Sequence, residues 1–190
     1  MKIRAFLAFD IPQKVKKTLG LLMMDFAKKE TGVKWIAAEN LHVTMKFFGD
    51  VDESLLLKDI SHAITSVTHA IRPMSLRCQG LGVFPNWRYP HVVWAGFTGD
   101  VEPVLQLQQT LEHKLVEFPI KKDERAFRLH LTIGREKQMK GSGPLMGLIS
   151  ELGPIDFGEV IIDHLTLYKS VLTKEGSVYT ALKAFHFGKQ

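Results

Sequence analysis

The chain has 190 residues, of which 45% are hydrophobic and 24% are charged, and this composition excludes a disordered, collagen-like or coiled-coil protein. Because a chain of this length suits one sizeable core, we treat residues 1–190 as a single domain. The formal net charge of +5 permits a nucleic-acid ligand without requiring one.

The first 48 residues predict a strand, a helix and a second strand. Residues 3–9 form an apolar strand that ends at Asp10. The helix that follows has one apolar face, made by residues that recur at spacings of three and four: Val15, Leu19, Leu22 and Phe26. In residues 41–48, polar side chains alternate with apolar ones, which is the period of a half-buried strand. Its polar face carries His42, Thr44 and Lys46.

The same order of elements returns further along the chain. A helix over 52–69 and a strand over 74–78 lead to residues 80–90, where glycines and prolines predict a loop. A strand, a helix from Pro103 and a strand over 127–133 follow, and in the last of these His130 and Thr132 alternate with apolar residues. His42 and His130 are 88 residues apart, and we interpret the chain as a duplicated unit.

The end of the chain predicts fewer elements. They are a glycine-rich loop over 141–144, a short helix ending near residue 152, a long strand over 157–169, a turn at 174–176 and a last strand over 178–187. With the duplication, this predicts an α+β, two-lobed fold whose antiparallel sheets face a central cleft and whose helices lie on the outside.

Each repeat carries one pair of polar side chains, His42 with Thr44 and His130 with Thr132. A histidine with a pKa of about 6.5 can act as acid or base near neutral pH, and a threonine hydroxyl can donate a hydrogen bond to an oxyanion. Related by a pseudo-two-fold axis, the two histidines would approach one point from opposite sides. In-line displacement at phosphorus needs this layout, with a base beside the attacking water and an acid beside the leaving oxygen.

Two tetrapeptides, His42–Met45 and His130–Ile133, match the H-x-T-x signature, and in these the chain resembles the 2H phosphoesterase superfamily. The surrounding sequence is similar to the branch of RNA 2',3'-cyclic phosphodiesterases, historically called 2'-5' RNA ligases. The blocks that carry this resemblance are Arg4–Asp10, Val33–Trp35, Glu39–Gly49, Gly82–Asn86, His130–Arg135 and Leu167–Leu172. They run from the first predicted strand almost to the last.

The resemblance implies hydrolysis of RNA 2',3'-cyclic phosphate ends to 2'-phosphates, without metal or cofactor. His42 would donate a proton to the leaving 3'-oxygen, His130 would activate water, and Thr44 and Thr132 would bind the phosphate. The reverse reaction would join RNA ends through a 2',5' linkage. The implied partners are RNAs with a 2',3'-cyclic phosphate, such as tRNA fragments or nucleotides, and we expect a monomer.

Four further residues are candidates for substrate binding. Arg135 would place positive charge near a phosphate. Lys46 shares the polar face with His42, and either contacts substrate or extends to solvent. Phe48 and Trp87 could stack on a base, as aromatic side chains do at single-stranded RNA ends.

A third H-x-T-x sequence occurs at His164–Leu167, outside the duplicated unit. Asp163 and Lys169 fall on the same face of that strand as its leucines, which spoils the separation of polar and apolar faces. We therefore predict no catalytic role for His164, and leave open that it lines the cleft.

Other readings of the same residues remain. The pocket could serve 2',5'-linked oligonucleotides or small cyclic nucleotides, or the chain could be a non-catalytic RNA-binding module. No histidine pair has the spacing of a metal site, and no phosphate-binding loop of the nucleotide-triphosphate type is present.

Nothing in the sequence points to export or membrane insertion. The longest apolar run, Ala5–Phe9, is far shorter than the roughly 20 residues that span a bilayer. The amino terminus has no small-residue cleavage site, and the single cysteine, Cys78, cannot form an internal disulfide. We expect a cytoplasmic protein.

Overall fold

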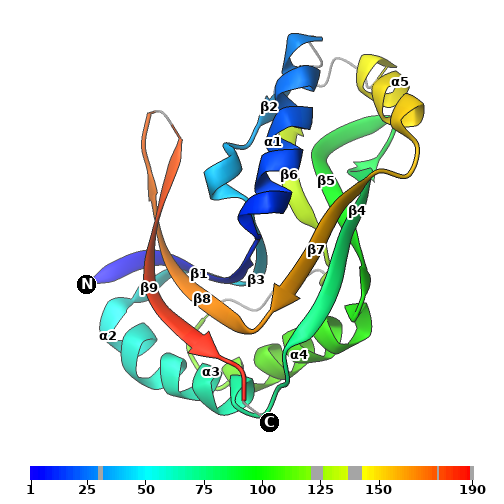
Figure 1. Cartoon of the computed structure of the whole chain (residues 1–190). Helices are drawn as coiled ribbons and strands as arrows, with labels where there is room; N and C mark the ends of the chain where they lie inside the picture. Colours follow the sequence, from blue (N-terminus) through cyan, green and yellow to red (C-terminus); the bar gives the residue numbers. More distant parts are fainter. Residues whose placement is uncertain (30–31, 121–125, 137–142, 175, 189–190) are drawn as a thin grey trace.

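Two antiparallel sheets form the framework of the computed structural model, which describes residues 1–29, 32–120, 126–136, 143–174 and 176–188 (Figure 1). The first sheet has the order β3-β1-β8-β9, with β1 Lys2–Asp10, β3 His42–Asp52, β8 His164–Leu172 and β9 Ser177–His186. The second has the order β2-β6-β5-β4-β7, with β2 Val33–Trp35, β4 Met74–Asn86, β5 Tyr89–Gly99, β6 Leu131–Glu136 and β7 Asp156–Ile162.

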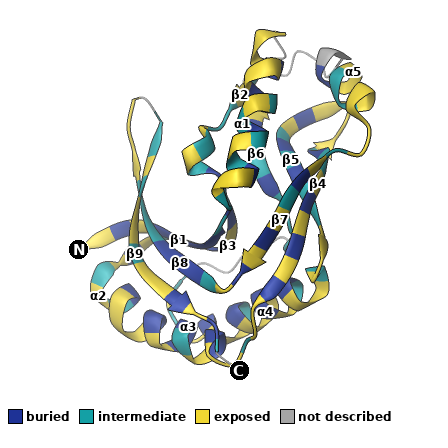
Figure 2. Ribbon diagram, in the orientation of Figure 1, coloured by how far each residue is buried: buried dark blue, intermediate teal, exposed yellow. Residues whose placement is uncertain are grey.

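Helices cover the outer sides of the sheets. They are α1 Gln13–Lys28, α2 Glu53–Leu55, α3 Ser61–Thr68, α4 Val101–Leu115 and α5 Gly143–Leu152, with a π turn, η2 Leu56–Ile60, between α2 and α3 and a 3-10 turn, η1 Ala38–Asn40, before β3. The side of each long helix that faces a sheet is buried and the opposite side is exposed (Figure 2). The predicted α+β fold with two antiparallel sheets is confirmed.

The two halves of the chain are interleaved. Strand β1 pairs with β8, so β1 and β3 share a sheet with β8 and β9 from the far end of the chain, while β2 leaves the first half to join β6 in the second sheet. Helix α1 packs against β7 of the second sheet, and α4 packs against β3 of the first. Each sheet therefore depends on residues from both repeats.

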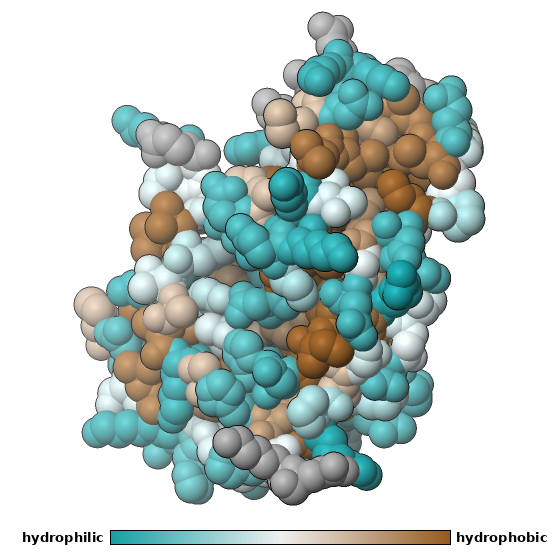
Figure 3. Space-filling view, in the orientation of Figure 1, coloured by the Kyte–Doolittle hydropathy of each residue, from teal (hydrophilic) through white to brown (hydrophobic). Residues whose placement is uncertain are grey.

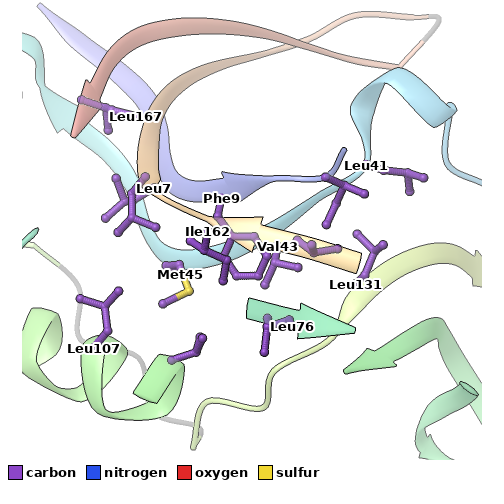
Figure 4. Close-up of a cluster of buried hydrophobic side chains, with 14 of the residues drawn as sticks. Leu7, Phe9, Leu41, Val43, Met45, Leu76, Leu107, Leu131, Ile162 and Leu167 are labelled. Carbon is purple, nitrogen blue, oxygen red and sulfur yellow. The ribbon is translucent and has the colours of Figure 1, made fainter. Parts of the chain in front are cut away.

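The hydrophobic core lies between the sheets and beneath the helices (Figure 4). Phe9 and Met45 come from the first sheet, Leu131 and Ile162 from the second and Leu107 from α4, and all are buried. Burying each such side chain contributes roughly 1.5–3 kcal/mol, so this layer fixes the distance between the strands that carry the two histidine motifs.

The predicted loop over residues 80–90 is wrong in its first part, because β4 continues as a strand to Asn86 and turns directly into β5. Gly80 has a φ of 69° at a shift in the strand register, a conformation that glycine adopts without strain. A Cβ atom at Gly82 would overlap the Trp94 indole on the neighbouring strand. The glycines therefore accommodate a bulge and a bulky neighbour inside a strand.

The predicted long strand over residues 157–169 is two strands in two sheets. Strand β7 ends at Ile162 in the second sheet, and β8 begins at His164 in the first. The buried apolar positions change from even numbers at Val160 and Ile162 to odd numbers at Leu165 and Leu167, a change of phase that the single-strand prediction overlooked. Part of the predicted loop over 141–144 and residue 175 of the predicted turn lie outside the described residues.

Apolar side chains gather on the surface over α5 and the nearby end of α1 (Figure 3). Exposed members of these helices are Leu21, Met24, Met146 and Leu152.

Across the described residues, no helix has the length and apolar character needed to cross a membrane.

Candidate functional site

A β-bulge in β3 decides which side chains reach the inner face of the first sheet. Thr44 pairs with Ala8 and Lys46 with Leu7, so Met45 is an extra residue on β3. A bulge reverses the alternation of faces beyond it. His42 and Thr44 therefore face the cavity that strands of both sheets line, opposite to the core residues Val43 and Met45, and beyond the bulge Phe47 faces the cavity.

The second motif contains an equivalent β-bulge. Thr132 pairs with Trp94 and Gly134 with Val93, so Ile133 is the extra residue on β6. Beyond the bulge Arg135 faces inward, at the position equivalent to Phe47. The duplication thus extends to the backbone irregularity, which lies at the fourth residue of each H-x-T-x motif.

Both motifs line one cavity of about 310 Å3 between the sheets. The residues that the sequence singled out and the structure brings together here are His42, Thr44, His130, Thr132 and Arg135. The other lining residues are Arg4, Phe6, Ile36, Asn40, Phe47, Ser170, Leu172, Ser177 and Tyr179. No aspartate or glutamate is among these described lining residues, while two arginines are, so the cavity favours an anion.

The two histidines are held in the same way. Nδ1 of His42 lies 2.8 Å from the Asn40 carbonyl oxygen, and Nδ1 of His130 lies 2.6 Å from the Arg128 carbonyl oxygen. A carbonyl oxygen only accepts, so in each neutral ring the proton sits on Nδ1 and Nε2 is left for chemistry. The Thr44 hydroxyl lies 3.1 Å from Nε2 of His42 and can donate to it.

Aromatic rings fix the planes of both imidazoles. Phe6 stacks on His42 with ring centroids 4.7 Å apart, and Tyr179 meets His42 edge-on at 5.2 Å. Phe84 meets His130 edge-on at 5.0 Å. Phe84, which falls within the predicted loop, is half-buried and supports His130 from β4.

Burial lowers the pKa of both histidines below the ordinary value, because it disfavours the charged imidazolium. The neighbouring charges differ between the two. The Asp10 carboxylate acts to raise the pKa of His42, against a smaller opposing effect of Lys16, whereas the Arg135 guanidinium lowers the pKa of His130 further. This asymmetry favours a proton on His42 relative to His130.

The Asp10 carboxylate is fixed by a network on the first sheet. Asp10 lies directly opposite His42 in the β1–β3 ladder. The Thr166 hydroxyl donates to its Oδ2 at 3.1 Å and the Tyr168 hydroxyl donates to its Oδ1 at 2.6 Å. Burial and the Asp10 charge raise the pKa of Tyr168, so this phenol stays a donor.

The third H-x-T-x sequence belongs to this network. His164 is not among the residues that line the cavity; its Nδ1 lies 2.6 Å from Asp163 Oδ1 and its Nε2 lies 3.8 Å from Asp10 Oδ2. Together with Thr166 it surrounds Asp10. His164 therefore does not line this cavity, and its lack of a catalytic role stays a prediction.

Removing the Asp10 charge should lower the pKa of His42. We expect Asp10→Asn to shift the NMR titration of the His42 Cε1 proton to lower pH, because the carboxylate stabilises the imidazolium. Asp156→Asn is the matched control, since that carboxylate pairs with Arg77 in the second sheet. An unchanged or higher His42 pKa in Asp10→Asn would show that Asp10 has no electrostatic role at the site.

Two predicted substrate contacts are wrong, and the bulge explains both. Lys46 is only 2% exposed, and its Nζ lies 2.8 Å from Glu112 Oε1 in a buried ion pair with α4. Phe48 is 3% exposed and belongs to the hydrophobic core. Without the bulge, both side chains would have shared the face of Thr44.

The structure does not bring Trp87 to the cavity. It lies in the turn between β4 and β5, 38% exposed, and is not among the lining residues.

Several lining residues were missed. Arg4 lies on β1 with its guanidinium carbon 4.7 Å from the centre of the Phe47 ring. Tyr179 comes from the last strand, and the Asn40 side-chain amide donates to the Ser177 carbonyl oxygen at 3.2 Å. Arg4 was visible as the polar residue of an apolar strand, but nothing in the sequence linked the last strand to the first motif. Within the described part of the chain, no three or more histidine, cysteine, aspartate or glutamate side chains are arranged so that they could hold a metal ion.

Known proteins are similar to this chain in sequence and in fold. A profile described as the 2'-5' RNA ligase superfamily matches residues 17–173. The chain is 35% identical over 181 residues to the RNA 2',3'-cyclic phosphodiesterase of Methanocaldococcus jannaschii, covering 95% of this chain and 99% of that protein. It is 35% identical over 185 residues to the protein of the same name from Methanothermobacter thermautotrophicus, covering 97% and 99%.

Solved structures have the same fold as this chain. The crystal structure of TT0787 of Thermus thermophilus has a TM-score of 0.82 at 26% identity, covering 99% of this chain and 100% of that one. Apo LigT of Escherichia coli has the same fold, with a TM-score of 0.74 at 23% identity and 99% coverage of both chains.

The fold and the paired motifs are those of a 2H phosphoesterase. Within that class, the chain belongs to the 2'-5' RNA ligase superfamily. The resemblance read from the motifs is thereby confirmed, as is the prediction that the chain is an enzyme of the hydrolase class.

Proposed function

We propose that this enzyme hydrolyses RNA 2',3'-cyclic phosphate ends to 2'-phosphomonoesters with its two cavity histidines as acid and base. The observation that carries the proposal is the pair of equivalent imidazoles, each with Nδ1 held by a backbone carbonyl, in a cavity that also holds two threonines and two arginines. The RNA substrate is supported by the names of relatives at 35% identity.

The charges around the histidines support the proposed roles. Asp10 favours the protonated form of His42, which is then available as the acid, and Arg135 favours the neutral form of His130, which is then available as the base. Nε2 of His130 takes a proton from water as the water oxygen attacks phosphorus. The bond from phosphorus to the 3'-oxygen breaks, and that oxygen takes the proton from Nε2 of His42, which leaves the phosphate on the 2'-oxygen.

Thr44 and Thr132 donate to the non-bridging oxygens, and the guanidiniums of Arg4 and Arg135 balance the charge that develops on them. After product release, His42 regains a proton from solvent and His130 loses its proton to solvent. With the 5'-hydroxyl of a second RNA in place of water, the same acid–base pair in the same roles would form a 2',5' linkage as the bond from phosphorus to the 3'-oxygen breaks. This ligation is a second proposal, supported by the superfamily to which the chain belongs. We further propose that a monomer in the cytoplasm acts on tRNA fragments.

The test is single-turnover hydrolysis of a short RNA that ends in a 2',3'-cyclic phosphate, in the presence of EDTA. We expect a product with a 2'-phosphate, resolved by its resistance to a 3'-specific phosphatase. A 3'-phosphate would overturn the assignment of the leaving oxygen. If the enzyme leaves the cyclic phosphate intact but cleaves a 2',5'-linked oligonucleotide, the substrate is of that second class. If it binds either RNA tightly and cleaves neither, the chain is a binding module.

A further inference from the structure

A second cavity, of about 430 Å3, opens beside the histidines and shares six lining residues with the first. The shared residues are Ile36, Asn40, Arg135, Leu172, Ser177 and Tyr179. Beyond them the second cavity continues to Lys34, Trp35, Ala37, Thr173 and Gly176. It lies between β2 with η1 on one side and the β8–β9 hairpin on the other, so a ligand longer than one phosphate group can continue into it.

Two cations stand next to each other where the cavities meet. Lys34 and Arg135 are direct partners in the antiparallel β2–β6 ladder, and both line the second cavity. Like charges directly opposite each other on one face of a sheet are destabilising. Among the described residues, neither side chain has an acidic partner in an ion pair or hydrogen bond. An anion bound between them would relieve the repulsion.

The remaining walls suit the rest of a nucleotide. Trp35, Leu172 and Tyr179 give aromatic and apolar surface, on which bases and sugars pack. Asn40, Thr173 and Ser177 give polar groups around it. No aspartate or glutamate is among the described residues that line this cavity.

We propose that the second cavity is a subsite for the nucleotide that precedes the reacting end, with Lys34 and Arg135 holding the phosphate that joins the two. The inference rests on the proposed function, because it takes the cyclic phosphate to lie between His42 and His130. The enzyme then prefers RNA chains that end in a 2',3'-cyclic phosphate over nucleoside 2',3'-cyclic phosphates. The preference comes from a phosphate that takes no part in the reaction. Lys34 is a specificity-determining residue that lies outside the catalytic cavity.

The test compares three substrates: adenosine 2',3'-cyclic phosphate, the same compound with a 5'-phosphate, and a diadenylate that ends in a 2',3'-cyclic phosphate. We expect the wild type to prefer the last two. In Lys34→Ala we expect a fall of about tenfold in one ratio, that of kcat/KM for the diadenylate to kcat/KM for adenosine 2',3'-cyclic phosphate. This is the effect of losing one charge-assisted contact. Lys34→Arg should retain the ratio. Lys28→Ala, another exposed lysine at the end of α1, is the matched control.

A second readout is the salt dependence of kcat/KM for the diadenylate. Loss of one phosphate contact to single-stranded nucleic acid should reduce the slope against log salt by about 0.7 in Lys34→Ala. An equal ratio in wild type and Lys34→Ala, or an equal fall in Lys28→Ala, would overturn the subsite. If the wild type turns over none of the three substrates, the proposed function itself fails, and the two failures are therefore distinguishable.

Discussion

Replacing either cavity histidine by alanine is expected to lower the single-turnover rate on RNA 2',3'-cyclic phosphate by about 10²–10⁴, the usual contribution of a positioned acid or base. Binding of the substrate should survive, because Arg4, Arg135 and the two threonines remain in the cavity. The double variant His42→Ala/His130→Ala should lose much less than the product of the two single losses, since the residues act as a unit.

His62→Ala is the matched control, because this histidine is exposed on α3. His164→Ala tests the third motif, and we expect it to change the rate less than tenfold, since its contact is with Asp10 rather than with the cavity. A loss in His164→Ala as large as in His42→Ala would reverse our placement of the site. Thermal melting of each variant separates lost chemistry from lost folding.

The pH profile of kcat/KM reports the same pair in the free enzyme. The limb on the alkaline side falls as His42 loses its proton, and the limb on the acid side falls as His130 gains one. Because burial lowers the pKa of both, we expect the maximum on the acid side of about 6.5. Asp10→Asn should move the alkaline limb to lower pH. The two apparent pKa values in the profile belong to the coupled pair of histidines. The NMR titration of His42 is therefore the measurement that assigns a pKa to an individual histidine.

Lys46→Met is expected to destabilise the fold by about 3 kcal/mol, because it leaves the Glu112 carboxylate without its buried cation. The Lys46 side chain is 1% exposed and that of Glu112 is 18% exposed, so water can solvate the unpaired Glu112 carboxylate only in part. Chemical denaturation measures the loss. Below the unfolding transition, kcat/KM should remain close to that of the wild type, since Lys46 does not line the cavity.

Adding Glu112→Leu to Lys46→Met should recover most of the lost free energy of unfolding, as replacement of a buried ion pair by apolar side chains commonly does. Lys114→Met, an exposed lysine on the same helix, is the control and should change stability little. If Lys46→Met raises KM without changing stability, Lys46 is a substrate contact after all.

The strand and helix pattern of most of the chain could be predicted from periodicity. The apolar face of α1 and the alternation around His42 are local properties of the sequence, and the structure has them where they were expected. The strand predicted over 127–133 is only partly right, because β6 begins at Leu131 and continues to Glu136. The pairing of the two motifs in one cavity followed from the repeat.

The errors come from properties that are not local. The bulges at Met45 and Ile133 leave no mark in hydrophobic alternation, yet they decide that Phe47 and Arg135 face the cavity while Lys46 and Phe48 do not. Bulges form because the neighbouring strand and the core demand them, and the neighbour of β3 is β1, far away in sequence. Sheet membership has the same origin, as the break at Asp163 shows.

The interleaving of the halves also sets when the enzyme can first work during synthesis. Strand β9 supplies Tyr179 and Ser177 to the cavity, and Ser177 accepts the hydrogen bond from the loop that orients His42. A nascent chain that already contains both histidines but not β9 still lacks a wall of its pocket and the edge strand beside β8. Because domains fold as units as they leave the ribosome, we expect no activity until β9 has emerged. An early stop that spares every catalytic group would still yield an inert product.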